Sequence, residues 1–258
     1  MPDLNGRASN RVESLWRYPV KSMRGEAVEE LRFEANGVVG DRSFGVLDVE
    51  SGTVLSAKRE GRLLEASAVL ISGVLSVQLP EGKVFHQSPA LDEALSRWLE
   101  RSVRVVAAAT HGAAIFEGIE DFERDDSALV YWEGLSGSFV DESAVHLLTT
   151  HDLRQLAEER PDLQWDVRRF RPNVVVDISD DDLDVSPTRR LQLGEVELEI
   201  EKPCSRCVMT TRAQPGNLER QLDVLRHVSR VHDGDVGVRA RVVRAGVLRL
   251  GDEVVNVA

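Results

Sequence analysis

Apolar and polar residues alternate along short stretches through most of the chain, and turn-forming residues separate these stretches. Alternation with a period of two, rich in β-branched residues, is typical of half-buried β-strands. It predicts strands at residues 12–16, 27–33, 43–49, 66–71, 103–107, 173–178, 196–201, 236–243 and 247–257. Glycines mark the turns between the first of these strands, at Gly25, Gly37, Gly40 and Gly52.

Two stretches have a helical period instead. Residues 89–99 are predicted to form a helix, because Ser88 is a suitable N-cap and Pro89 suits the first helical position. One face of this helix carries Leu91, Ala94, Leu95, Trp98 and Leu99. Residues 217–230 are predicted to form another helix. Its apolar stripe, which indicates core packing, consists of Leu218, Leu222, Leu225 and Val228.

A further helix is predicted to begin at Thr149 or Thr150. Thr149 and Asp152 have the spacing of a capping box, in which the two side chains bind each other's backbone N–H groups. Pro161 is expected to end this helix, since proline has no N–H to donate.

The predicted strands outnumber the helices and do not alternate with them regularly. This argues against a doubly wound parallel sheet and favours a mainly β protein with a few helices, an α+β class with two β-barrel-like units. Residues 108–138 are rich in Gly, Ala and acidic side chains, so we expect a long loop or the domain boundary there. The predicted domains are residues 1–107 and 108–258.

Composition narrows the classes of partner. The chain has 258 residues and a net charge of -12, which disfavours sustained binding to nucleic acid or to an anionic membrane surface. Five acidic residues crowd one stretch, which is predicted to be a solvated loop because it lacks the glycine and terminal glutamate of a calcium-binding loop. They are Asp177, Asp180, Asp181, Asp182 and Asp184.

The chain gives no sign of export or membrane insertion. Residues 1–10 are polar, without the apolar segment of a signal peptide, and no run of 18 or more apolar residues occurs. The two cysteines are too few for a disulfide framework. We therefore expect a cytoplasmic protein that has no membrane partner.

The two cysteines form the sharpest local feature, Pro203-Cys204-Ser205-Arg206-Cys207. A thioredoxin-like redox pair would need a helix start after it, and residues 208–211 are a poor one. A structural zinc site needs four ligands, whereas no other cysteine is present and the six histidines show no paired spacing. The remaining interpretation is a single thiolate bound to a soft metal, favoured by nearby basic side chains. From the spacing, inert thiols, redox thiols and a metal thiolate all stay open.

Three other segments carry groups that suit an anionic ligand. They are Tyr18-Pro19-Val20-Lys21-Ser22, Gly40-Asp41-Arg42 and Phe170-Arg171-Pro172-Asn173. An arginine can bind phosphate with two hydrogen bonds, and a lysine or serine adds further donors. Each segment alone is typical of an ordinary surface, but their combination favours an anionic ligand.

Together these segments resemble the MOSC family, named after the C-terminal domain of molybdenum cofactor sulfurases, in the form with an N-terminal β-barrel domain. The resemblance covers nearly the whole chain in the same order. It includes residues 18–22, 37–42, 139–153 and 170–173, the Cys204–Cys207 motif with Thr210-Thr211, and residues 246–252. The characterised members that it resembles include amidoxime-reducing components and bacterial hydroxylamine-reducing proteins.

The resemblance implies a site for the molybdenum cofactor. In such proteins the second cysteine of the motif, here Cys207, ligates molybdenum and is central to catalysis. The positions implied to contact the pterin phosphate or its surroundings are Lys21, Ser22 and Arg42. Those implied to line the rest of the cofactor are Ser143, Arg171, Asn173, Ser205 and Arg206. A dianionic phosphate needs such donors, and the cofactor's own dithiolene leaves only one thiolate to be supplied by the protein.

The resemblance further implies a reductase of small N-hydroxylated substrates that takes electrons from a separate flavin or iron–sulfur protein. One departure affects the substrate side: where the family has Asp after Thr210-Thr211, this chain has Arg212. Two alternatives stay open, a non-redox carrier of molybdenum cofactor or sulfur and a binding module with an inert Cys pair. If one cofactor is shared, Arg42 and Arg171 are predicted to meet at a cleft between the two units, with Lys21 on its rim.

Overall fold

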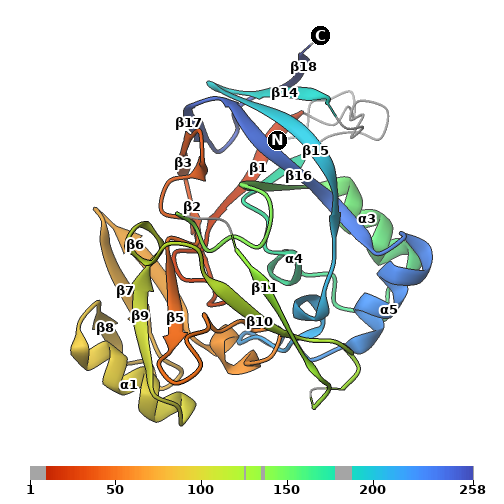
Figure 1. Ribbon diagram of the computed structural model, residues 1–258. Helices are drawn as coiled ribbons and strands as arrows, with labels where there is room; N and C mark the ends of the chain where they lie inside the picture. Colours follow the sequence, from red (N-terminus) through yellow and green to blue (C-terminus); the bar gives the residue numbers. More distant parts are fainter. Residues whose placement is uncertain (1–9, 125, 135–136, 178–187, 258) are drawn as a thin grey trace.

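The computed structural model describes residues 10–124, 126–134, 137–177 and 188–257 (Figure 1). Over these residues it contains eighteen strands, five α-helices and two short 3-10 helices. The predicted class, mainly β with a few helices, is confirmed. Among the described residues no helix has the length and apolar character needed to cross a membrane.

The largest sheet combines both ends of the chain. Its order is β18-β14-β15-β16-β12-β13-β1-β2, and its neighbours are antiparallel except for the parallel pair β12 and β13. The bounds are β1 (Arg11–Arg17), β2 (Glu26–Val28), β12 (Val145–Thr149), β13 (Val174–Asp177), β14 (Arg190–Leu193), β15 (Val196–Ser205), β16 (Asp235–Arg244) and β18 (Val254–Val257). Alternating Val and Leu side chains of these strands form one apolar core. A smaller sheet of β17 (Gly246–Arg249), β3 (Glu30–Glu34) and β4 (Gly37–Val38) closes over this core.

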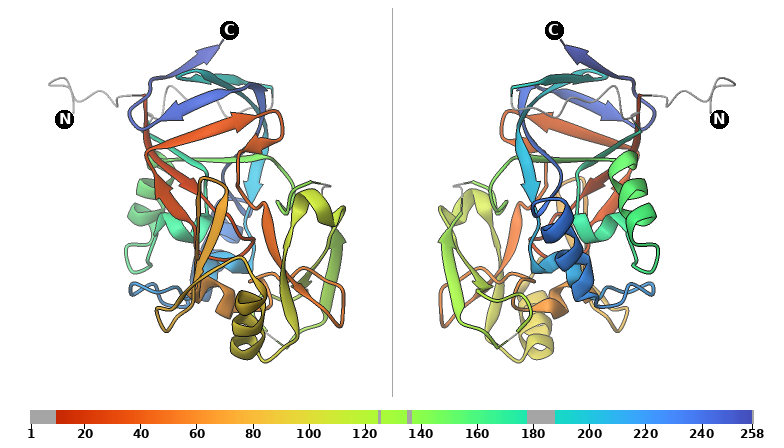
Figure 2. Two further views of the ribbon diagram at one scale, coloured as in Figure 1. Left: turned by 90° about the vertical axis from the view of Figure 1, so that its left-hand side faces the viewer. Right: turned by 90° about the vertical axis from the view of Figure 1, so that its right-hand side faces the viewer.

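A second core lies below this sheet in Figure 2, around the segment between residues 44 and 107. It is built from β5 (Phe44–Asp48), η1 (Gly61–Glu65), β6 (Ser67–Ile71), β7 (Val74–Gln78), β8 (Val84–His86), α1 (Pro89–Leu99) and β9 (Val103–Ala107). The predicted helix at residues 89–99 is confirmed, with Ser88 as its N-cap residue and Leu91 and Leu95 fully buried. Ser88 does not cap through its side chain, which donates to the carbonyl of His86 instead.

Residues 108–138 were expected to form a long loop or to contain the domain boundary, and the first of these alternatives is wrong. This stretch contains α2 (Ala108–His111) and the antiparallel hairpin of β10 (Ile115–Ile119) and β11 (Leu129–Glu133). The hairpin packs on Leu47 and Val54 through Phe116, so burial of an aromatic ring outweighs the weak local pattern. The boundary between residues 107 and 108 stays a prediction, while β1 and β3 pair directly with the C-terminal strands β13 and β17.

The remaining helices lie together beside the large sheet (Figure 1). They are α3 (Thr150–Glu159), α4 (Val167–Phe170), η2 (Val208–Thr211) and α5 (Leu222–Val231). The capping box of Thr149 and Asp152 is present, with both reciprocal hydrogen bonds formed. Asp177, at the end of β13, accepts a hydrogen bond from Thr150 Oγ1 at 2.5 Å. The other residues of the acidic run lie outside the described residues.

The helix predicted at residues 217–230 begins five residues later than expected, at Leu222. Gly216 and Asn217 both have positive φ angles, +83° and +63°, which a right-handed helix excludes. Leu218 is buried, but in an isolated β-bridge with Gln214. Two predicted strands are also divided in the structure: residues 27–33 become β2 and β3, and residues 247–257 become β17 and β18.

Candidate functional site

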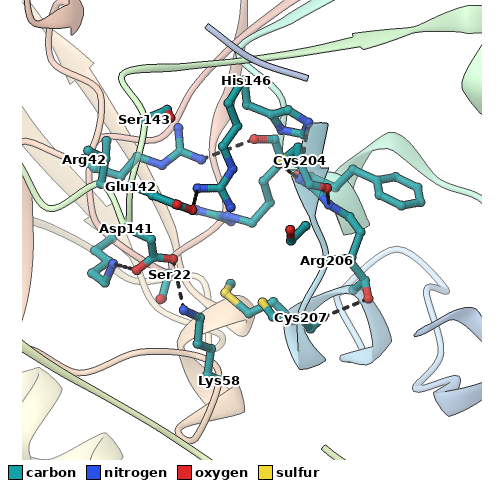
Figure 3. A pocket seen from close by; sticks show the side chains of 18 of the residues that line it. Ser22, Arg42, Lys58, Asp141, Glu142, Ser143, His146, Cys204, Arg206 and Cys207 are labelled. Atoms are coloured by element: carbon teal, nitrogen blue, oxygen red, sulfur yellow. Dashed lines mark hydrogen bonds and ion pairs between the residues drawn. The ribbon is translucent and has the colours of Figure 1, made fainter. Parts of the chain in front are cut away.

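A cavity of about 430 Å³ collects every site residue that the sequence predicts. The nine residues in its wall are Lys21, Ser22, Arg42, Ser143, Arg171, Asn173, Ser205, Arg206 and Cys207. They come from the β1–β2 and β4–β5 connections, the segment before β12, the turn after α4, and the end of β15. Figure 3 shows Cys207 across the cavity from Ser22 and Asp141. Segments distant in sequence thus meet in one place, while the roles of the nine residues stay predictions.

Cys207 is held by a tight turn between β15 and η2. Its carbonyl accepts hydrogen bonds from Thr210, from the backbone N at 3.0 Å and from Oγ1 at 2.9 Å. Arg169 lies beneath this turn with only 1% of its surface exposed, and donates from Nη1 to the carbonyl of Thr210 at 3.0 Å. Burial lowers the pKa of Arg169 to about 10. The half-buried Cys207 side chain is therefore presented to the cavity by a braced backbone.

The two thiols differ in their surroundings. Cys204 is buried, and its Sγ accepts a hydrogen bond from Arg206 Nη2. Arg206 also donates to the carbonyls of Cys204 and Phe170, at 3.0 Å each. Its guanidinium is thus largely bound to the protein itself. Cys207 is the more accessible of the two thiols, and its role as the metal ligand stays a prediction.

Arg42 and Arg171 lie on the same aromatic ring. The guanidinium carbons are 4.4 Å and 4.2 Å from the ring centroid of Tyr18. Arg42 is paired with Asp41 and donates from Nη2 to the carbonyl of Arg171 at 3.2 Å. Arg171 donates from Nη1 to the carbonyl of Met23 at 2.8 Å, but its buried Nη2 has no hydrogen-bond partner among the described residues. Burial, and next the nearby Arg42 charge, lower the pKa of Arg171 to about 10.

Lys21 is buried beside an acidic partner. Its Nζ donates to Asp141 Oδ1 at 2.6 Å and to the carbonyl of Phe139 at 2.9 Å. Burial lowers the pKa of Lys21 to about 8, although the Asp141 carboxylate acts in the opposite direction. Lys58 also pairs with Asp141, at 3.3 Å, and lies over the ring of Trp132. Both cations hold the pKa of Asp141 well below its usual range, against the effect of burial.

The side-chain amide of Asn173 bonds the backbone of two neighbouring segments, β12 and β1. Its Oδ1 accepts from the His146 backbone N at 3.2 Å, and its Nδ2 donates to the Trp16 carbonyl at 3.3 Å. These bonds join β12 to β1 at the cavity floor. His146 is half-buried, and its desolvation in the wall, followed by the Arg206 charge, holds its pKa well below the usual value. It therefore contributes a neutral imidazole to the wall.

The cavity has the opposite charge from the molecule as a whole. Its wall carries seven basic side chains and only two acidic ones, whereas the whole chain has a net charge of -12. The basic residues are Lys21, Arg42, Lys58, Arg169, Arg171, Arg206 and Arg239. Such a concentration of cations in a concave site focuses a positive potential and favours an anionic ligand.

Sequence comparison assigns the chain to a family. It matches two family models, the MOSC N-terminal beta barrel domain over residues 9–124 and the MOSC domain over residues 135–255. The chain belongs to the MOSC family. It is 26% identical over 94% of its length to mitochondrial amidoxime reducing component 2 of Rattus norvegicus, of which it covers 82%. It is 25% identical over 84% of its length to molybdenum cofactor sulfurase of Drosophila yakuba, of which it covers only 29%.

Among solved structures, the YuaD protein from Bacillus subtilis is similar at 13% identity, with a TM-score of 0.45, over 95% of this chain and 93% of that one. YiiM from Geobacillus stearothermophilus is 19% identical, with a TM-score of 0.36, and the match covers 45% of this chain and 55% of that one.

This MOSC site also contains residues that sequence reasoning missed. Lys58, Asp141, Glu142, His146 and Arg239 all line the cavity. Glu142 pairs with both Arg239 and Lys202 at the cavity edge. Asp141, Glu142 and His146 lie within the segment 139–153 that carries the resemblance, so their polar character there was an available signal. Lys58 and Arg239 lie in stretches that look like ordinary surface, and only the fold brings them to the site.

Arg212, the departure from the family pattern, lies next to the site. Its Nη2 donates to the carbonyl of Lys58 at 2.7 Å, and the residue is buried. Arg212 thereby connects the segment after η2 to the segment that carries Lys58. An aspartate at this position would have no donor for that carbonyl.

Proposed function

We propose that this MOSC protein binds the molybdenum cofactor, with the Cys207 thiolate as the protein ligand to the metal, and reduces N-hydroxylated compounds. One observation carries the proposal. A half-buried thiol shares a strongly basic cavity with a buried arginine nitrogen that no described residue satisfies with a hydrogen bond. A thiolate suits a soft metal, and an unpaired buried guanidinium donor suits a phosphate oxygen.

The side chains of the cavity wall suit both the phosphate end and the metal end of the molybdenum cofactor. A buried polar atom without a hydrogen-bond partner destabilises the fold by about 1–3 kcal/mol. A ligand oxygen that accepts a hydrogen bond from Nη2 of Arg171 would remove this penalty, which favours binding. We assign Arg42, Arg171, Lys21 and Ser22 to the phosphate end. We assign Ser143, Ser205 and Arg206 to the remaining wall, with Cys207 at the metal end. When bound, the cofactor supplies redox chemistry at molybdenum.

The protein's own residues then have distinct tasks. Lys21 and Lys58 flank Asp141, a carboxylate that stays ionised at neutral pH because its pKa is held low. Asp141 thus fixes the two ammonium groups in the wall. The neutral His146 adds a polar group to the wall without adding charge. We infer that a small uncharged N-hydroxylated substrate enters beside Lys58 and Trp132, on the same side of the cavity as Asp141.

The substrate class rests on similarity to proteins named as amidoxime-reducing components, at about 26% identity in rat and human. Electrons are proposed to come from a separate flavin or iron–sulfur protein. The two cysteines of this chain cannot ligate a four-cysteine cluster, and no Gly-x-Gly-x-x-Gly dinucleotide motif is present. A cytoplasmic location stays a prediction.

A second candidate function is a carrier that binds the cofactor, or passes sulfur, without reducing an organic substrate. Two observations favour it. The chain is similar to proteins named molybdenum cofactor sulfurase, although it spans less than a third of their length. Arg212 also stands where the substrate-side aspartate was expected, and it is engaged with Lys58.

The test is metal analysis followed by a turnover assay. Protein purified from a host that makes the cofactor is expected to contain about one molybdenum per chain. It should reduce an amidoxime or hydroxylaminopurine with a chemical reductant, but not with a nicotinamide cofactor alone. Molybdenum without turnover would favour the carrier. Protein without molybdenum, from a host that loads a control enzyme, would contradict the reductase and the cofactor carrier, and would leave a sulfur carrier or a binding module with an inert Cys pair.

A further inference from the structure

A second polar cluster lies away from the cavity, where the end of α3 meets the end of α5. It consists of Glu159, the last residue of α3, His227 on α5, and His232, which follows α5. Figure 1 shows these two helices side by side, and none of the three residues belongs to the cavity wall in the part of the chain that the structure describes. The proposed function therefore makes no use of this cluster.

The three side chains converge on one point. Nε2 of His227 and Nε2 of His232 each lie 2.7 Å from the same oxygen, Oε2 of Glu159. The three candidate ligand atoms all lie within 4.8 Å of one another. Zn²⁺ binds imidazole nitrogen and carboxylate oxygen at about 2.0–2.2 Å. Binding of an ion among the three atoms would require the carboxylate oxygen to move outward from its present 2.7 Å contacts with the two imidazoles.

The surroundings of the cluster resemble those of a metal ligand set. Oε1 of Glu159 accepts a hydrogen bond from Gln155 Nε2 at 2.9 Å, which orients the carboxylate. The ring of Trp165 packs against His227, with the centroids 5.8 Å apart. Outer contacts of this kind fix ligand orientation in metal sites. The three side chains are 10–25% exposed, so an ion has a path from solvent and water has access to an open coordination position.

We propose that Glu159, His227 and His232 form a divalent metal site, best suited to Zn²⁺, with three protein ligands and water completing the coordination. The ion would join the end of α3 to the end of α5. The residues after His232 lead directly into β16, which carries Arg239 of the cavity wall. The site would therefore stabilise the support of the cavity without taking part in its chemistry.

The sequence shows no metal-binding spacing here because His227 and His232 are five residues apart, a separation that places two side chains on different faces of a continuous helix. In the structure the two side chains still meet, because α5 ends at Val231. His232 then leaves the helix with its backbone at φ -120° and ψ 24°. The third ligand comes from another helix, 68 residues earlier. The absence of paired histidine spacing was thus a poor guide to histidine ligands.

The competing explanation is a hydrogen-bonded triad in which both imidazoles donate to the carboxylate. A titration with Zn²⁺ and Co²⁺ separates the two, using full-length protein in which Cys204→Ser and Cys207→Ser remove the thiols. We expect one Zn²⁺ per chain by calorimetry and a rise in Tm of about 5 °C at saturating metal. Bound Co²⁺ should show visible bands of nitrogen and oxygen ligation without the intense near-ultraviolet band of a thiolate.

Matched variants locate the ion. His232→Gln and Glu159→Gln should each weaken Zn²⁺ binding by at least about 100-fold, whereas the exposed His86→Gln should leave it unchanged. Circular dichroism without metal checks that each variant folds, and Glu159→Gln decides the result if His232→Gln does not fold. Absence of saturable Zn²⁺ binding, or binding that survives both site variants, would overturn the proposal. No cofactor or turnover is needed, so failure of the proposed function would not affect this outcome.

Discussion

Arg42 donates from Nη2 to the backbone carbonyl of Arg171 across a sequence separation of 129 residues, and both guanidiniums lie against the ring of Tyr18. The prediction that these two arginines meet is therefore confirmed. Lys21 was expected on the rim of the site, and this detail is wrong, because the residue is only 4% exposed and its side chain is bonded to Asp141. The ring of Tyr18 provides an uncharged surface that keeps two like charges close together.

Arg171→Lys is expected to weaken binding of the cofactor, or of sulfate as an anion probe, by about 10–100-fold. A lysine retains one charge, but it cannot donate to the Met23 carbonyl and to a ligand in the fixed directions of the two guanidinium nitrogens. Molybdenum content and calorimetry with sulfate measure the effect. Arg241→Lys, which removes an exposed arginine paired with Glu199, is the matched control. Equal losses in the two variants would contradict a specific role for the Arg171 guanidinium in binding the anion.

The cysteine pair should respond asymmetrically to substitution. Cys207→Ser is expected to lose most bound molybdenum or all turnover, because a hydroxyl is a poor ligand for a soft metal. Cys204→Ser should be milder, since the serine oxygen can still accept the hydrogen bond from Arg206 in its buried position. Metal analysis of both proteins, prepared in parallel, tests this difference. Equal metal and equal turnover in the two variants would show that Cys207 is not the ligand.

Asn173→Ala is expected to lower the free energy of unfolding by about 1–3 kcal/mol. Its amide satisfies the His146 backbone N–H and the Trp16 carbonyl, and truncation leaves both groups buried without that partner. Denaturant unfolding of the cofactor-free protein measures the change. A variant that keeps full stability but loses the cofactor would instead give Asn173 the direct binding role that the resemblance implied.

The parts of the molecule that the sequence predicted well are those coded locally. The helix after Ser88 and the capping box at Thr149 each depend on residues within one or two turns, and both are present. The late start of α5 depends on Gly216 and Asn217, whose left-handed conformations come just before the apolar stripe and are followed by Leu218 in a β-bridge. The stripe predicted burial correctly, since Leu218 and Leu225 are both buried, but it did not locate the first helical turn.

The site itself was predictable only where a motif marks it. Cys207, Arg42 and Arg171 lie in recognisable segments, and the cavity contains all of them. Lys58 lies in a segment without such a marker, and Asp141 has no feature in the sequence that pairs it with Lys21, 120 residues away. These charges are brought together by long-range strand pairing and by packing of the β10–β11 hairpin. A single sequence does not encode such contacts in any local pattern.

Lys21 should make anion binding depend on pH. Its pKa is about 8 in the folded protein, below the ordinary value of 10.5, because burial disfavours the charged amine. Below about pH 8 the amine is charged and attracts an anion, so sulfate affinity is expected to fall by about tenfold as the pH rises through this value. The stability of the fold depends on pH in the opposite direction. The stability that Lys21 contributes is fully present above pH 10.5 and is lost as the pH falls through about 8, because the folded state must then bury a charged amine.

Calorimetry with sulfate between pH 6 and 9.5 measures the first effect, because the charge of sulfate does not change over that range. Lys21→Gln should bind weakly at all pH values and show no transition near pH 8. Asp141→Asn removes the carboxylate that raises the pKa of Lys21, so the transition should move to lower pH. Loss of the transition in Lys21→Gln and its shift to lower pH in Asp141→Asn are different results, and a general loss of folding would not produce both. A wild-type affinity that stays constant through pH 8, or a transition that Lys21→Gln retains, would assign the titration to another group.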